Sequence, residues 1–174
     1  MSGAALRIVG IDPGTLVVGL GVLDVRGGDA RYVACEALRA PRDRPPAERL
    51  RCLHDELAAR LAEHRPDAVA LERVFVGKNV ASALRIGEAR GVALVCAARV
   101  GAPVFEYPPA AVKRAIAGFG AADKAQMAAW IGRLLGLPRP PEPHDAADAL
   151  SLALTHAHRS RTLPGEEPAA PPLR

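Results

Sequence analysis

Short apolar runs open the chain, and each is broken by a turn signal, which is the pattern of β-strands. Three such runs, rich in branched residues, cover Leu6–Asp12, Leu16–Val25 and Arg31–Leu38. Glycine-containing turns separate them, and strands joined by short turns pair back on one another. The beginning of the sequence therefore predicts an antiparallel sheet of three strands.

The pattern then changes to a helical period. Between Pro45 and Pro66, leucines recur at spacings of three, four and four residues, at Leu50, Leu53, Leu57 and Leu61. This stripe predicts an amphipathic helix with one buried face. The next run, Asp67–Glu72, is almost continuously apolar, which is typical of a central strand that is covered on both sides.

The rest of the chain alternates between helical and strand-like segments. We expect a helix over Asn79–Val100, a fifth strand over Pro103–Tyr107 and two helices on either side of Gly118–Gly120. After a proline-rich loop, an apolar helical pattern covers His144–His158. Residues 159–174 have no periodicity and contain four prolines, which predicts a disordered tail.

This order of elements predicts an α/β protein. An antiparallel meander followed by alternating strands and helices forms a five-stranded mixed sheet with helices on both faces. The ribonuclease H-like fold, among others, has this layout. Because 174 residues is the size of one domain, we expect a single domain over residues 1–158, followed by the tail 159–174.

Composition excludes several classes of protein. Hydrophobic residues make up 49% of the chain and charged residues 24%, as in ordinary soluble globular proteins. No apolar run reaches the ~18–20 residues of a membrane span, and the first residues do not resemble a secretory signal. Three widely spaced cysteines, Cys35, Cys52 and Cys96, favour reduced thiols over a zinc site or a disulfide framework. We therefore expect a cytoplasmic protein without membrane partners.

The charge is concentrated in the middle of the chain. The formal net charge is only +4, but residues 72–133 hold nine Lys and Arg against four acids. A basic region of this kind is typical of proteins that bind a polyanion such as nucleic acid. A solvated surface would give the same pattern, so charge alone leaves both interpretations open.

Four carboxylates stand at the ends of apolar segments. Asp12 closes the first strand, Glu72 closes the central strand, and Asp145 and Asp148 lie three residues apart in the first turn of the last helix, which places them on one face. Each has an ordinary structural explanation: a turn residue, an exposed strand end, or acids that complement a helix dipole. Considered together, they have a chemical one.

The two strands that end in these acids are expected to be neighbours at the sheet centre, where ligands collect beyond the strand ends. Carboxylates converging there would repel one another unless a cation lay between them. Oxygen ligands without thiolates suit Mg²⁺, with Mn²⁺ as a substitute. Two such ions about 3.5–4 Å apart activate water and stabilise the leaving oxygen in phosphodiester hydrolysis. The pattern therefore favours a metal-dependent nuclease.

Four motifs that contain these acids closely resemble the bacterial RuvC family of Holliday junction resolvases: GIDPGT, ALERVFVGKNVASALRIGEARGVAL, PVFEYPPAAVKRAIAGFGAADKAQM and HDAADALSLALTHAH. The resemblance runs from about Arg7 to His158 with family-like spacing. It implies a homodimeric, magnesium-dependent endonuclease with two ions per subunit. Such an enzyme nicks two like-polarity strands of a four-way DNA junction symmetrically, leaves 5′-phosphates and 3′-hydroxyls, and cooperates with the RuvA–RuvB branch-migration machinery.

The resemblance also implies roles for individual residues. The metal-binding and catalytic acids of the family fall on Asp12, Glu72, Asp145 and Asp148. Its catalytic lysines, which also contact DNA, fall on Lys113 and Lys124, and the aromatic residue that inserts into the junction falls on Phe75. A core-capping role for the phenylalanine and surface roles for the lysines are the alternatives.

Several other residues bear on DNA binding. Lys78, Arg85 and Arg114 are candidate phosphate contacts. Arg73 follows the acid of the central strand where many relatives carry an uncharged polar residue. His144 precedes Asp145, and some relatives have a histidine in place of the third acid. Adjacent residues on a helix point about 100° apart, so His144 points away from the face that Asp145 shares with Asp148. Asp145 is therefore the expected ligand, and His144 is an outer contact.

The helix expected over Asn79–Val100 carries a face of small residues, alanines and the glycines Gly87 and Gly91. Such a face suits close contact with a second helix, as a symmetric dimer requires. It could equally pack on the sheet of its own chain.

Three other functions compete with junction resolution. An ATPase of the actin and Hsp70 type shares the GIDxGT-like loop but needs two domains, for which 174 residues are too few. Another ribonuclease H-like nuclease would use the same acids on an RNA–DNA hybrid or a different DNA. A junction-binding protein without catalysis would not require the complete acid set.

Overall fold

The computed structural model describes residues 5–73 and 80–162. Its elements follow the predicted order, with boundaries that differ by a few residues. They are β1 (Leu6–Asp12), β2 (Val17–Arg26), β3 (Asp29–Arg39), α1 (Pro46–His64), β4 (Ala68–Glu72), α2 (Val80–Arg99), β5 (Val104–Tyr107), α3 (Pro109–Ala117), α4 (Lys124–Leu134) and α5 (His144–Thr162). The last helix therefore continues four residues beyond its expected end at His158.

The five strands form one mixed sheet in the order β3-β2-β1-β4-β5. β1 pairs with β2 and β2 with β3 in antiparallel fashion, whereas β1 with β4 and β4 with β5 are parallel. This confirms the predicted meander and the mixed sheet. β1 and β4 are the central pair, so their carboxyl ends meet at the same edge of the sheet.

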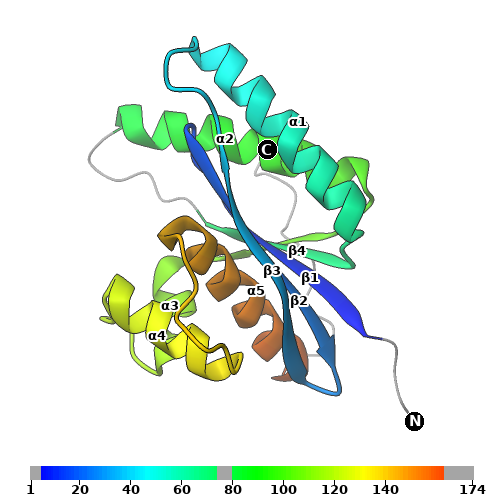
Figure 1. The fold of residues 1–174 in the computed structure, drawn as a ribbon, viewed down its shortest axis with the longest axis vertical. Coiled ribbons are helices and arrows are strands. Elements are labelled where there is room, and N and C mark those ends of the chain that lie inside the picture. The colour runs from blue at the N-terminus through cyan, green and yellow to red at the C-terminus, as the bar shows by residue number, and fades with distance from the viewer. Residues whose placement is uncertain (1–4, 74–79, 163–174) are drawn as a thin grey trace.

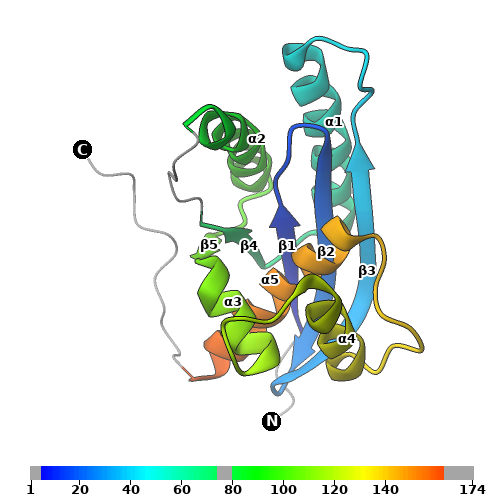
Figure 2. The same cartoon turned by 90° about the vertical axis from the view of Figure 1, so that its left-hand side faces the viewer.

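Helices cover both faces of the sheet, as Figures 1 and 2 show. α1 and α2 pack on one face over a core that includes Val9 and Val69. α5 lies across the other face over a core that includes Ile8 and Ala70, and α3 and α4 pack beside it. Because side chains alternate across a strand, even-numbered residues of β1 and β4 face α5.

Three glycines allow α5 to lie directly on the backbone of β1 and β2. A Cβ atom at Gly10 would lie 1.9 Å from the carbonyl oxygen of Ala149, and one at Gly19 would lie 1.9 Å from that of Asp145. At Gly21 it would lie 2.5 Å from the amide nitrogen of Leu150. These distances leave no room for any side chain, so the glycines set how closely the acid-bearing helix approaches the sheet.

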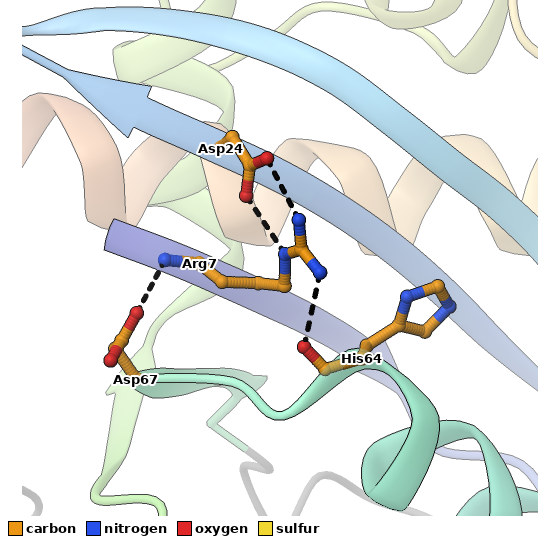
Figure 3. Close-up of polar contacts among 4 residues, drawn as sticks. All are labelled: Arg7, Asp24, His64 and Asp67. Atoms are coloured by element: carbon orange, nitrogen blue, oxygen red, sulfur yellow. Dashed lines mark hydrogen bonds and ion pairs between the residues drawn. The ribbon is translucent and has the colours of Figure 1, made fainter. Parts of the chain in front are cut away.

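A cluster of hydrogen bonds and an ion pair around Arg7 connects the segments at the amino-terminal ends of β1 and β4 (Figure 3). The Arg7 guanidinium donates to both carboxylate oxygens of Asp24 on β2 at 2.8 Å, and to the backbone carbonyl of His64 at 3.3 Å. The Arg7 amide donates to Asp67 at 2.7 Å. This bidentate pair holds the pKa of Asp24 below its usual range. The cluster joins β1, β2 and the connection from α1 to β4.

Within residues 5–73 and 80–162, no helix is both long and apolar enough to cross a bilayer. Cys35, Cys52 and Cys96 are free thiols, and Cys96 is buried in the core between α2 and the sheet.

Candidate active site

Asp12 and Glu72 end the two central strands on the same side of the sheet. β1 and β4 pair in parallel up to the partners Ile11 and Leu71, so the two acids follow at adjacent positions. The alternation that turns Ile8 and Gly10 toward α5 also turns Asp12 toward that helix. Glu72 follows Ala70 in the same way. Two carboxylates thus converge below the first turns of α5.

A third carboxylate, Asp148 of α5, completes one wall of an open cleft at this edge. The cleft is also lined by α3 and α4, and its residues are Asp12, Glu72, Pro109, Val112, Lys113, Lys124, Met127, Asp148, Ser151 and Leu152. Asp145, one helical turn earlier, is half-buried and not part of this lining, but its charge acts on Asp12. The structure therefore brings three of the four predicted acids into one cleft and keeps the fourth nearby.

The acids perturb one another electrostatically. Burial is the largest cause that raises the pKa of Asp12, and the charges of Asp148, Glu72 and Asp145 also raise it, so that it reaches about 7. Burial also raises the pKa of Glu72, and the Asp148 charge adds to it. Both shifts mean that burial and neighbouring negative charge disfavour the ionised carboxylates.

Lys124 brings a positive charge to these acids. It is the first residue of α4, whose start is held by a capping box: the Asp123 carboxylate accepts from the Gln126 amide, and the Gln126 side chain accepts from the Asp123 amide. From there, the Lys124 ammonium lies 3.1 Å from a carboxylate oxygen of Asp148. Its charge lowers the pKa of both Asp12 and Glu72. Lys113 of α3 lines the same cleft.

The donor set of the cleft fits a hard divalent cation. Its potential ligands are carboxylate oxygens, which Mg²⁺ and Mn²⁺ prefer, and a cation would neutralise the charges of Asp148, Glu72 and Asp145 that act on Asp12. In the described part of the chain, however, no group of three or more Asp, Glu, His or Cys side chains is arranged so that it could hold an ion as it stands. One of the acids, Asp148, is paired with Lys124 instead.

The other predicted residues lie in different places. Arg85 on α2 and Arg114 on α3 are exposed and outside the cleft lining, and Phe75 and Lys78 lie outside the described residues. Arg73 is also exposed, and its amide donates to the Tyr107 carbonyl. His144 is exposed and lines a separate depression with Arg39 and Glu142, so it does not take part in the carboxylate cleft.

Sequence reasoning missed part of the cleft wall. Val112, Met127 and Leu152 form an apolar side beside the acids, and Ser151, whose hydroxyl donates to the Ala147 carbonyl, lies one turn beyond Asp148. The helical spacing from Asp148 to Leu152 was a usable signal for the α5 side. The contributions of α3 and α4 depend on how these helices pack, which no local pattern reports.

Comparisons with known proteins agree on one family. The family model described as crossover junction endodeoxyribonuclease RuvC matches residues 8–156. A protein of that name from Chloroflexus aggregans is 49% identical over 158 residues, covering 91% of this chain and 96% of the relative. Another from Pelotomaculum thermopropionicum is 46% identical over 153 residues, covering 88% of this chain and 93% of that protein.

Solved structures give the same result. The structure of T. thermophilus RuvC in complex with a Holliday junction substrate superposes with a TM-score of 0.84 at 39% identity, covering 90% of this chain and 96% of that one. The match supports the expected ribonuclease H-like fold. From the matched motifs, the shared fold and the coverage of nearly the whole relatives, the chain belongs to the crossover junction endodeoxyribonuclease RuvC family.

Proposed function

We propose that the carboxylate cleft is the active site of a structure-selective endonuclease that resolves four-way DNA junctions. The observation that carries this proposal is the convergence of acids from β1, β4 and α5 with two lysines in a single open cleft. Metal-dependent hydrolysis of a phosphodiester uses both kinds of group: acids that hold the cations and lysines that bind the phosphate. Family membership and the junction bound by the Thermus relative point to the same substrate.

Asp12, Glu72 and Asp148, with Asp145 beside them, would hold Mg²⁺ or Mn²⁺, with two ions per subunit. Bound there, such ions would supply Lewis-acid chemistry: activation of a water and stabilisation of the leaving oxygen of the cleaved strand. Cleavage with release of the 3′-oxygen leaves a 5′-phosphate and a 3′-hydroxyl. Lys113, which lines the same cleft, would bind an oxygen of the scissile phosphate and stabilise the negative charge that develops on the phosphate.

Cations outside the cleft would extend the DNA contact. Arg114 follows Lys113 on α3 and is exposed, and Arg85 is exposed on α2. Both would bind the phosphate backbone of the junction arms, which positions the DNA without reading its sequence. Phe75 and Lys78 remain predicted DNA contacts, and cooperation with RuvA–RuvB remains a prediction from the family resemblance.

The protein would act as a homodimer, because two symmetric cuts require two sites related by one axis. α2 offers a suitable face. Residues spaced four, three, four and four apart form an outward stripe of apolar and small residues: Val80, Leu84, Gly87, Gly91 and Val95. Neither glycine has another group within 4 Å of a Cβ position. The opposite side of α2, with Ala89, Ala93 and Cys96, is buried in its own chain, which leaves the stripe facing outward.

Replacing Leu84 by glutamate is expected to give a folded monomer. Leu84 is 65% exposed in the single chain, so the change does not disturb the core, but it places two charges against each other across a twofold axis. Light scattering after gel filtration should report half the wild-type mass. Leu6, also exposed at 50% but at the start of β1, provides the control: Leu6→Glu should remain dimeric.

The function is tested by offering the purified protein three labelled substrates: a mobile four-way junction, a linear duplex and an RNA–DNA hybrid. We expect paired nicks in the junction in Mg²⁺, ligatable products, and no cutting in EDTA. Cleavage of the hybrid with an intact junction would instead identify another ribonuclease H-like nuclease. Junction binding without cutting in Mg²⁺ or Mn²⁺ would identify a non-catalytic binding protein.

A further inference from the structure

The ion pair between Lys124 and Asp148 joins two residues of the same cleft from different helices. The ammonium and the carboxylate oxygen are 3.1 Å apart, and the side chains are 72% and 34% exposed. The lysine is fixed at its base by the capping box of α4, while its long side chain reaches across open solvent. The backbone of Lys124 is therefore held in the helix start, while most of its side chain is exposed to solvent.

Lys124 acts on the whole acid group and not only on its direct partner. Its charge lowers the pKa of Asp12 and of Glu72, and Asp12 and Asp145 act on it in return. Lys113 lines the same cleft, yet forms no ion pair among the described residues. The two lysines of the cleft therefore have different environments.

We propose that Lys124 is a resident counter-ion of the acid cleft, which a divalent ion displaces from Asp148 and which then becomes available to a DNA phosphate. This inference rests on the metal site proposed above. It assigns the lysine a second role, the coupling of metal binding to DNA binding. The lysine remains protonated throughout, and only its partner changes.

The physical basis is competition for one carboxylate. Asp148 cannot give its oxygens fully to a divalent ion while an ammonium lies 3.1 Å from one of them, and the two cations also repel each other. Breaking this partly exposed ion pair opposes metal binding by a modest amount. A phosphate entering the cleft attracts the displaced ammonium, so DNA should lower the cost of the exchange. By linkage, DNA and metal then strengthen each other's binding.

The test is the affinity of the DNA-free enzyme for Mn²⁺, measured by calorimetry. The measurement is made at about pH 8.5, where carboxylates are mostly ionised. Lys124→Met keeps the length of the side chain and removes the charge. We expect this variant to bind Mn²⁺ about threefold or more tightly than the wild type. Lys113→Met is the matched control from the same cleft, and its affinity should change much less.

Two results separate this inference from the proposed metal site. Asp148→Asn should weaken Mn²⁺ binding; if it leaves the affinity unchanged, the metal-site proposal itself is wrong. If Asp148→Asn weakens binding while Lys124→Met binds Mn²⁺ no more tightly than the wild type, the counter-ion inference alone is overturned. Circular dichroism and melting curves confirm that each variant is folded.

The coupling to DNA has its own measurement. A junction made uncleavable by substitution at the scissile phosphate should tighten Mn²⁺ binding in the wild type. In Lys124→Met the tightening should be smaller, by about the factor that separates the two proteins without DNA. Equal tightening in both proteins would refute the release of Lys124 to the phosphate.

Discussion

Asp12→Asn and Glu72→Gln are each expected to reduce junction cutting by about 1000-fold or more, which corresponds to about 4 kcal/mol of lost transition-state stabilisation. Both side chains stand where the central parallel strands end, in the cleft that also contains Asp148. The amides keep the shape but remove the negative charge that a divalent ion requires. Junction binding should survive, because the lysines and arginines that we propose as phosphate contacts are unchanged.

The same Asp12→Asn change is expected to stabilise the metal-free protein. The pKa of Asp12 is raised from 3.8 to about 7 in the folded state, so folding favours its protonated form. The stability that this preference contributes is complete below the unfolded pKa and is lost as the pH rises to about 7. At pH 8 the wild type therefore lacks it, and asparagine, which never ionises, should be more stable by about 1–3 kcal/mol.

Two measurements test the loss of cutting and the gain in stability that are expected for Asp12→Asn. Single-turnover cleavage of a labelled junction reports the rate, and thermal unfolding in EDTA at pH 5 and pH 8 reports the stability. The stabilisation should be larger at the higher pH. Asp43→Asn, a change at an exposed loop position, should alter neither quantity. A loss of cutting with unchanged or lower stability at pH 8 would contradict the electrostatic description of the cleft.

Gly10→Ala is expected to destabilise the protein by about 3 kcal/mol and to lower its melting temperature by about 10 °C. The added Cβ would lie 1.9 Å from the Ala149 carbonyl oxygen, which is backbone and cannot rotate away. α5 must then move off the sheet. Since this helix carries Asp145 and Asp148, cutting should also fall, by about 100-fold even at temperatures where the variant is folded.

Gly120→Ala is the control for this prediction. Gly120 lies in the connection between α3 and α4, and no other group is within 4 Å of its Cβ position, so both stability and cutting should stay close to wild type. Comparing the two variants by thermal unfolding and cleavage distinguishes the general effect of replacing a glycine from the steric clash of the added Cβ atom with α5. A Gly10→Ala variant with the same melting temperature as the wild type would refute the close contact between α5 and β1.

Local patterns were sufficient to predict the elements and the mixed sheet. The leucine stripe before Pro66 became α1, and the apolar run that ends at Glu72 became a central strand. Both signals are strong because burial of one face repeats at the period of the element. The boundary of the last helix was predicted less well: α5 runs to Thr162, four residues into the segment for which the composition had predicted disorder.

The sequence by itself was enough to predict which residues carry the chemistry. Asp12 and Glu72 end their strands, Asp145 and Asp148 share a helix face, and four motifs place all of them in one family. Such information is local, because residue type and spacing along the chain are enough to state it.

Only the tertiary structure decided how these groups meet. Gly19 and Gly21 fix the approach of α5 through backbone contacts with residues far along the chain. The packing of α4 brings Lys124 to Asp148, and half-burial by distant segments raises the pKa of Asp12. Each depends on contacts between segments that are remote in sequence, and hydrophobic periodicity carries no information about such contacts.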